Sequence, residues 1–148
     1  MSDTDAFLDT TMARYRDAEI ALHNGDAAPR KAMWSHTDPA TLLGAAFSAT
    51  GWAEIEPIFN RLGARFSNCT SYEHEVIAAG ANGDLAYIVA FEHTTASVNG
   101  SASLPYTLRA TTVFRREYGE WKVVHRHADP VASENGVELV QRLVATEA

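Results

Sequence analysis

The spacing of the apolar side chains changes near residue 68, and this change is the strongest constraint on how the chain can fold. Before it, apolar residues recur every three or four positions, as in Trp52, Ile55, Phe59 and Leu62, which places them on one face of a helix. After it, residues alternate with a period of two, which is the period of a β-strand. Helices followed by a run of long strands predict an α+β layer architecture, a curved antiparallel sheet covered by N-terminal helices.

The boundaries follow from turn residues. We expect helices at residues 4–24, 28–35 and 51–66, with Thr50 as the N-cap of the third, and a short strand at 40–44. Long strands are predicted at 71–80, 84–98, 103–118 and 120–130, separated by "ANGD", "NGS" and "YGE". Residues 133–147 are compatible with a last helix. We interpret residues 1–148 as one domain.

Charge and composition exclude several classes of function. The net charge of −7 leaves no basic surface for a nucleic acid. A single cysteine, Cys69, excludes an internal disulfide and fits a reducing compartment. The acidic start is unlike a signal peptide, and no apolar run reaches the length of a membrane span. We therefore expect a cytoplasmic protein with no nucleic-acid or membrane partner.

Side-chain size predicts which face of each strand packs against the helices. In the strand 84–98 the larger apolar side chains are those of Leu85, Tyr87, Val89 and Phe91. In the strand 103–118 the apolar set is Tyr106, Leu108, Ala110, Thr112 and Phe114. We expect both sets to point inward, because the face of a sheet that packs on a core is the apolar one.

The stretch "HRH" at residues 125–127 cannot be oriented by composition, so the preceding hairpin must decide. A two-residue turn at Tyr118 and Gly119 would need positive φ at a tyrosine, which is unfavourable. A three-residue loop with the bulge at Gly119 is therefore predicted, and its register pairs Ala110 with Arg126. Arg126 would then point inward, and the flanking histidines outward. One extra bulge would reverse this assignment.

The segments "ALHNGD", "GW" and above all "TTVFRREYGEWKVVHRHAD" resemble the NTF2-like superfamily, and within it the SnoaL-like, DUF4440-type proteins. The last strands are also similar to the association domain of calcium/calmodulin-dependent kinase. The resemblance implies a ketosteroid isomerase-like, cystatin-like cone with a pocket at its wide end, and homodimers formed through the outer sheet face. The fold hosts isomerases, cyclases, dehydratases and binding modules, so it does not fix a function. The predicted inward positions Val89, Ala110 and Thr112 carry no carboxylate, so no catalytic base follows from the resemblance.

Candidate site residues come from the predicted inner face. An inward Arg126 would bind a carboxylate or carbonyl oxygen of a ligand, or would form a structural ion pair with Glu54, Glu56 or Asp129. Tyr87 would orient the ligand, and His127 would be a reserve base. The predicted ligand-binding side chains are those of Trp34, Trp52, Phe59 and Thr112.

The spacing of His125 and His127 suits a metal, but the sequence fixes no third ligand, so neither a metal nor another cofactor is predicted. We expect a protein that binds an apolar or polyketide-like small molecule. Catalysis of the isomerase, cyclase or hydratase type stays open. The alternative is a non-catalytic module that uses its outer sheet face for self-association or for a partner protein.

Overall fold

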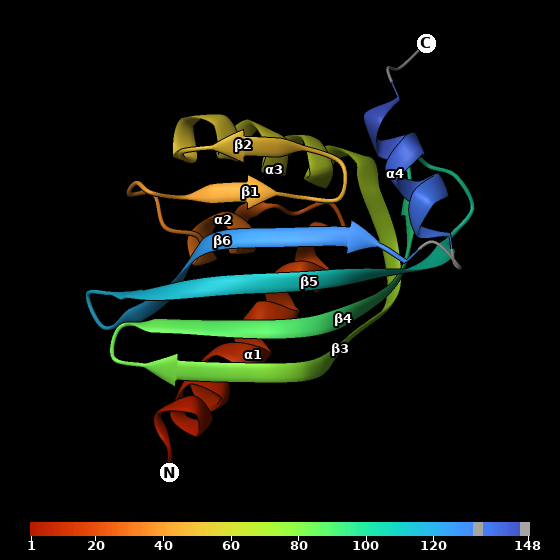
Figure 1. Cartoon of the computed structure of the whole chain (residues 1–148). Helices are drawn as coiled ribbons and strands as arrows, with labels where there is room; N and C mark the ends of the chain where they lie inside the picture. The colour runs from red at the N-terminus through yellow and green to blue at the C-terminus, as the bar shows by residue number, and fades with distance from the viewer. Residues whose placement is uncertain (132–134, 146–148) are drawn as a thin grey trace.

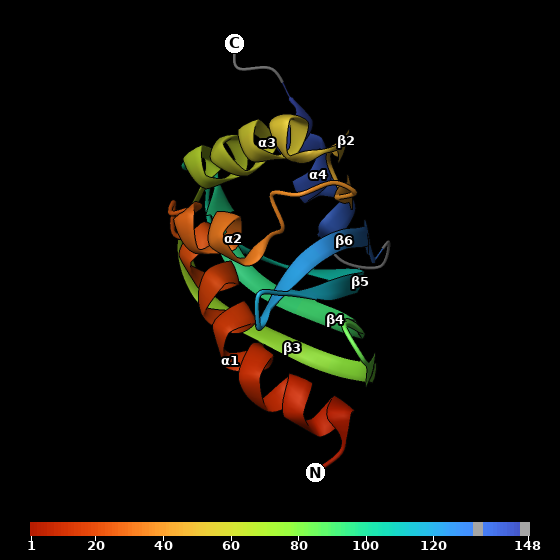
Figure 2. The ribbon, with the colours of Figure 1, turned by 90° about the vertical axis from the view of Figure 1, so that its left-hand side faces the viewer.

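The computed structural model describes residues 1–131 and 135–145. In chain order the elements are α1 (Asp3–Leu22), α2 (Ala28–Met33), β1 (Thr41–Leu43), β2 (Ser48–Thr50), α3 (Trp52–Arg65), β3 (Phe66–Asn82), β4 (Leu85–Val98), β5 (Leu104–Glu117), β6 (Glu120–Pro130) and α4 (Gly136–Val144). The strands form one six-stranded sheet in the order β2-β1-β6-β5-β4-β3. Helices α1, α2 and α3 cover one face of this curved sheet, and α4 stands at one end of it (Figures 1 and 2). The predicted α+β cone is confirmed.

The strands β3 to β6 are joined by tight hairpins, whereas β1 reaches the sheet by pairing in parallel with β6. Helix α1 begins in a capping box, in which the side chains of Ser2 and Asp5 accept from each other's backbone N–H groups. The N-cap of helix α3 is Gly51, with φ of 84°, and not the predicted Thr50. Thr50 belongs to β2, a strand that the sequence analysis missed, and its N–H donates to the Glu54 side chain at 3.2 Å.

Two apolar clusters fill the space between helices and sheet. One lies beneath α1 and α3 and is built on fully buried aromatic rings, including Phe7, Phe59 and Phe114. The other lies at the end of the sheet near α4 and contains Phe66 and Leu139. Buried charged and polar side chains lie between the two clusters, and they define the candidate site.

The predicted inner face of β4 is wrong. Ala86, Ile88 and Ala90 are buried in the cluster that contains α1, whereas Tyr87 is 43% exposed on the outer face. Small side chains can be buried there because the large rings of Phe7, Tyr15 and Phe114 belong to the same cluster and fill its volume. The Tyr87 ring lies over Gly80 of β3, where a Cβ would approach its Cε1 to 2.6 Å. In β4 the larger side chains therefore pack on the outer face, and side-chain size does not indicate which face is buried.

The predicted hairpin between β5 and β6 is also wrong, although its conclusion about Arg126 is confirmed. Glu117 pairs with Glu120, so the turn has two residues, and both Tyr118 (φ 50°) and Gly119 (φ 80°) have positive φ. This turn alone would have directed Arg126 outward. A bulge at Val124 reverses the alternation, and Arg126 pairs with Thr112 instead of Ala110 and is 5% exposed.

Candidate functional site

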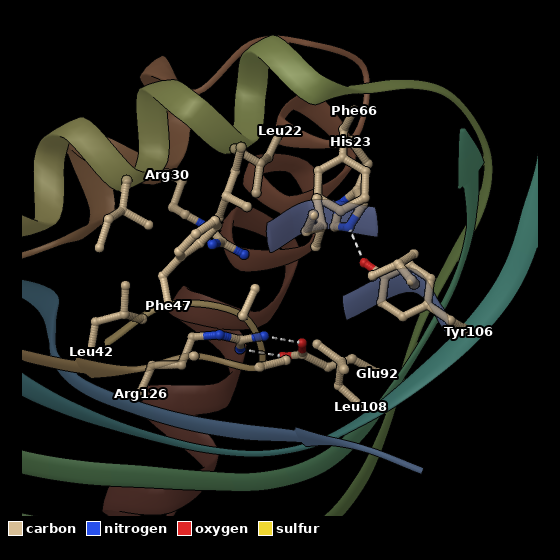
Figure 3. A pocket seen from close by; sticks show the side chains of 17 residues that line it. Leu22, His23, Arg30, Leu42, Phe47, Phe66, Glu92, Tyr106, Leu108 and Arg126 are labelled. Atoms are coloured by element: carbon tan, nitrogen blue, oxygen red, sulfur yellow. Dashed lines mark hydrogen bonds and ion pairs between the residues drawn. The ribbon is translucent and has the colours of Figure 1, made fainter. Parts of the chain in front are cut away.

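A pocket lies between α1, α3, the loop after β1, the sheet and α4 (Figure 3). Its volume, measured as the space open to the centres of water-sized spheres, is about 60 Å³, which is room for about four to six waters. Most of the lining is apolar: Leu22, Leu42, Ile58, Leu62, Phe66, Leu108, Leu139 and Leu143. The polar side chains in the lining are those of His23, Arg30, Glu92, Tyr106 and Arg126. A few polar groups in an apolar wall are typical of a small-molecule site.

The ion pair of Arg126 with Glu92 forms one polar wall. The Arg126 Nη1 and Nη2 groups donate to the two oxygens of Glu92 at 2.9 and 2.6 Å. The Tyr15 hydroxyl accepts from Arg126 at 2.9 Å and donates to Glu92 at 3.1 Å, so the Thr112 hydroxyl donates to Tyr15 at 3.0 Å. Burial alone would raise the pKa of Glu92, but the adjacent charge of Arg126 holds it well below its usual value. Both groups of the pair are therefore charged.

A second buried ion pair faces it from α2. The Arg30 Nε group donates to Glu19 of α1 at 2.8 Å, and its Nη2 group also bonds that carboxylate. Burial favours the neutral carboxyl, but the charge of Arg30 outweighs this effect and lowers the pKa of Glu19. Two arginines and two carboxylates thus sum to zero charge around the cavity. Figure 3 shows Arg30 and Arg126 reaching toward the cavity from different elements.

A histidine–tyrosine pair forms the third polar group. The His23 Nδ1 group donates to the backbone carbonyl of Glu19 at 2.7 Å, which fixes the tautomer. Its Nε2 atom then accepts from the Tyr106 hydroxyl at 2.5 Å. Burial lowers the pKa of His23 below 6.5, so the imidazole is neutral at neutral pH. This is the only neutral base among the polar side chains that line the described cavity.

The arginines of the cavity keep unused donors. Within residues 1–131 and 135–145, Nη1 of Arg30 and Nε of Arg126 make no hydrogen bond, while every oxygen of the two carboxylates already accepts from an arginine. A ligand oxygen that accepts hydrogen bonds would find partners here. A ligand carboxylate would bring an additional charge into a buried site that is already neutral, which is costly.

The predicted catalytic residues are not brought together. Arg126 lines the cavity, but Tyr87 lies on the outer face of the sheet, which contradicts its predicted role in orienting a ligand. The His127 side chain is 53% exposed on the outer face, 3.6 Å from the Asp129 carboxylate. The outward direction predicted for His127 is confirmed, and it separates this histidine from the cavity.

None of the four predicted ligand-binding residues lines the cavity itself. Phe59 is fully buried under the Arg30 guanidinium, which lies 5.1 Å from its ring centre, and Trp52 is stacked on His36. Trp34 and Thr112 line a second, smaller space of about 10 Å³, measured in the same way, on the other side of the two arginines. That volume admits about one water.

Sequence reasoning missed most of the polar lining. The face predicted to be inward in β4 excludes Glu92, although a lone carboxylate in an apolar strand opposite an inward arginine is the signal for a buried pair. His23 lies just after α1 in "ALHNGD", where the sequence pattern indicates only the end of a helix. Nothing in the sequence indicates that Arg30 and Glu19 would be buried together.

The comparisons with known proteins place this geometry in a family. A family model described as a SnoaL-like domain matches residues 10–133. A provisionally named dehydratase of the NTF2-like family from Streptomyces avermitilis is 18% identical, with a TM-score of 0.71 over 87% of this chain and 99% of its own. A provisionally named ketosteroid isomerase from Parabacteroides distasonis is 11% identical, with a TM-score of 0.62 over 82% of this chain and 85% of its own.

A provisionally named calcium/calmodulin-dependent kinase II association domain from Exiguobacterium sibiricum is 10% identical, with a TM-score of 0.63 over 88% of this chain and 96% of its own. At these identities the likeness is one of fold. A search of curated protein sequences gave no significant match. In the part of the chain that the structure describes, no helix has the length and hydropathy to cross a membrane, and no three His, Cys, Asp or Glu side chains cluster as metal ligands would.

Proposed function

The chain belongs to the SnoaL-like domain family, and from that premise we propose that its cavity binds a small, neutral, mostly apolar molecule through one carbonyl-type oxygen. The observation that carries the proposal is the pair of unengaged N–H groups on Arg30 and Arg126 in a mostly apolar wall. The ion pairs leave no net positive charge for an anion, so the ketone and not the carboxylate is the matching ligand.

Three probes of equal size test this preference: 2-pentanone, n-hexane and butanoate, measured by ligand-observed NMR. The double variant Glu19→Gln/Arg30→Met removes the donor without leaving a buried charge unpaired. We expect the double variant to bind 2-pentanone about tenfold more weakly, because a hydrogen bond from a charged donor contributes about 1.5 kcal/mol or more. Binding of n-hexane should not change. Exposed Arg16 on α1 provides the control, Arg16→Met. Equal losses for ketone and alkane, or tighter binding of butanoate than of 2-pentanone, would refute the proposal.

The same groups support removal of a proton next to the ligand carbonyl. As the C–H bond breaks, its proton passes to the Tyr106 oxygen, and the Tyr106 proton passes to Nε2 of His23. The electron pair moves to the carbonyl oxygen, whose negative charge is held by the Arg30 N–H groups. Isomerases, cyclases and dehydratases of carbonyl compounds share this step, and the provisional name dehydratase of the Streptomyces avermitilis protein is consistent with it.

Proton–deuterium exchange tests this step directly. In D₂O the protein should accelerate exchange of the protons next to the carbonyl of 2-pentanone, and Tyr106→Phe should abolish the acceleration while leaving 2-pentanone bound. His23→Gln should have the same effect. Full exchange activity in Tyr106→Phe would rule out the relay and leave the binding role in place.

A second candidate function is self-association through the outer sheet face. The observation that favours it is a set of exposed apolar side chains on the outer face of β3 and β4: Ile77, Leu85 and Tyr87. Arg109 and Asp129 lie beside this set and supply charges of both signs. Sedimentation velocity should show a homodimer that Ile77→Glu converts to a monomer. A monomeric wild-type chain would remove this candidate.

A further inference from the structure

Helix α4 supplies one wall of the cavity. Leu139 and Leu143 lie one helical turn apart, so they share a face, and both are almost fully buried and line the cavity. Helix α4 stands across the end of the sheet near α3 (Figures 1 and 2). All the polar lining groups come from other elements. The helix therefore shapes the cavity without contributing to its chemistry.

The sequence of α4 lies outside the family match, which ends at residue 133. The helix is joined to the rest by side chains and not by strand pairing. Nη1 of Arg65, at the end of α3, donates to the backbone carbonyls of Leu143 and Ala145 at 2.7 and 3.1 Å. Asn135 donates to the Pro105 carbonyl at 2.9 Å. Arg65 thus satisfies free carbonyls and complements the negative end of the helix.

Because the cavity is small, the wall supplied by α4 affects which ligands fit. The space of about 60 Å³ admits a ligand of about five or six non-hydrogen atoms. The other apolar walls belong to the end of α1, to the sheet, to α3 and to the loop after β1, whose Phe47 side chain also lies at the cavity. On α4 the side chains that end in the cavity are Leu139 and Leu143, so shortening either of them gives a longer ligand room on that side.

We propose that Leu139 and Leu143 of α4 are the specificity-determining residues of the cavity, setting the length of the apolar part of the ligand. The inference rests on the proposed function in that it takes the cavity to be a ligand site. The oxygen of the ligand is held at the arginine side, and its hydrocarbon part extends toward α4.

Two probe series separate the length limit from the oxygen preference. The first is the 2-alkanones from 2-butanone to 2-decanone, and the second, which has no oxygen, is benzene, ethylbenzene and n-butylbenzene. In wild type, 2-alkanone affinity should rise about fourfold per methylene until the cavity is full and then fall. Leu143→Ala should move the affinity maximum to a 2-alkanone about three carbon atoms longer, because the substitution removes three carbon atoms. Leu143→Val, which removes one, should move it by about one carbon atom. Leu143→Ala should also bind n-butylbenzene more tightly than wild type does.

The matched control is Val144→Ala, because Val144 is the next residue of the same helix and is 44% exposed. Near-ultraviolet circular dichroism verifies that each variant is folded, and Leu143→Val gives a milder change should Leu143→Ala unfold. If the tightest-binding ligand of both series has a longer chain in the leucine variants than in wild type, the inference is supported. If the leucine variants bind longer alkylbenzenes than wild type does but no protein binds a ketone, the oxygen preference is overturned and the role of α4 stays intact. An unchanged optimum in both leucine variants, or an equal change in Val144→Ala, would overturn the role of α4.

Discussion

Removing Arg126 alone should destabilise the protein strongly at pH 7. In this variant Glu92 should lower stability at neutral pH and not in acid, whereas in wild type Glu92 contributes stability at neutral pH and loses that contribution in acid. In Arg126→Met, Glu92 stays buried, and the partners left to it are the Tyr15 hydroxyl at 3.1 Å and the His74 Nε2 atom at 3.6 Å, which do not replace the two bonds lost with the arginine. The carboxyl will take up a proton to avoid an unpaired buried charge. From its ordinary pKa of 4.5 to pH 7, that protonation costs about 3.4 kcal/mol, close to the general cost of breaking a buried pair.

The pH dependence follows from the direction of each pKa. In wild type the pKa of Glu92 in the folded state is lowered, so the pair contributes stability above pH 4.5 and loses it as the pH falls through the folded-state pKa. In Arg126→Met burial raises the folded-state pKa, so the penalty is present at pH 7 and vanishes below pH 4.5. The difference in unfolding free energy between variant and wild type should therefore shrink as the pH falls from 7 to 4.5.

Urea unfolding at several pH values measures this difference, and thermal unfolding should show a loss of about 7–14 °C at pH 7. The double variant Glu92→Gln/Arg126→Met should lose only about 1–2 kcal/mol, because no unpaired charge remains. Arg109→Met, on the exposed face of β5, is the control. A penalty in Arg126→Met that does not change with pH, or a double variant as unstable as the single one, would refute this reasoning.

Three further predictions concern other parts of the molecule. Because burial lowers the pKa of His23, the unfolded chain binds a proton more readily, so this group removes stability as the pH falls below 6.5; His23→Gln should reduce that loss, and an unchanged pH profile would contradict the assignment. Tyr118→Asn should stabilise the protein by about 0.5–1 kcal/mol in urea unfolding, because asparagine accepts the positive φ of the turn; no gain would mean that the exposed tyrosine ring makes an unrecognised contact. Phe59→Ala should cost about 3–5 kcal/mol, because the ring is fully buried beneath Arg30; a loss below 1 kcal/mol would contradict its place in the core.

The spacing of apolar residues was enough to predict the fold, because each helix and strand buries one face and that face appears in the sequence as a regular repeat of apolar residues. Phe7, Tyr15 and Leu22 mark the buried face of α1, and the alternation from Tyr106 to Phe114 marks that of β5. Element ends were less predictable. Phe66 continues the helical spacing of α3, yet it begins β3, because the chain needs to leave the helix there to enter the sheet.

The face of β4 and the hairpin register depended on tertiary packing that no local pattern contains. Ala86 and Ala90 are buried in the cluster with the large rings of Phe7 and Tyr15, and the larger Tyr87 covers a glycine on the other face. The inward direction of Arg126 was predicted, but through two errors that offset each other: an unexpected two-residue turn and an unexpected bulge at Val124. The identity of its partner, Glu92, could not follow from a register that was wrong.

The most direct test of the cavity as a ligand site is a titration of ¹⁵N-labelled protein with 2-pentanone, followed through the arginine side-chain resonances. If the ketone oxygen binds between the two ion pairs, the resonances of Arg30 and Arg126 will shift together and saturate, and those of Arg109 on the outer face will stay in place. Shifts confined to Arg109, or no saturable shift at Arg30 and Arg126, would contradict the proposed binding site.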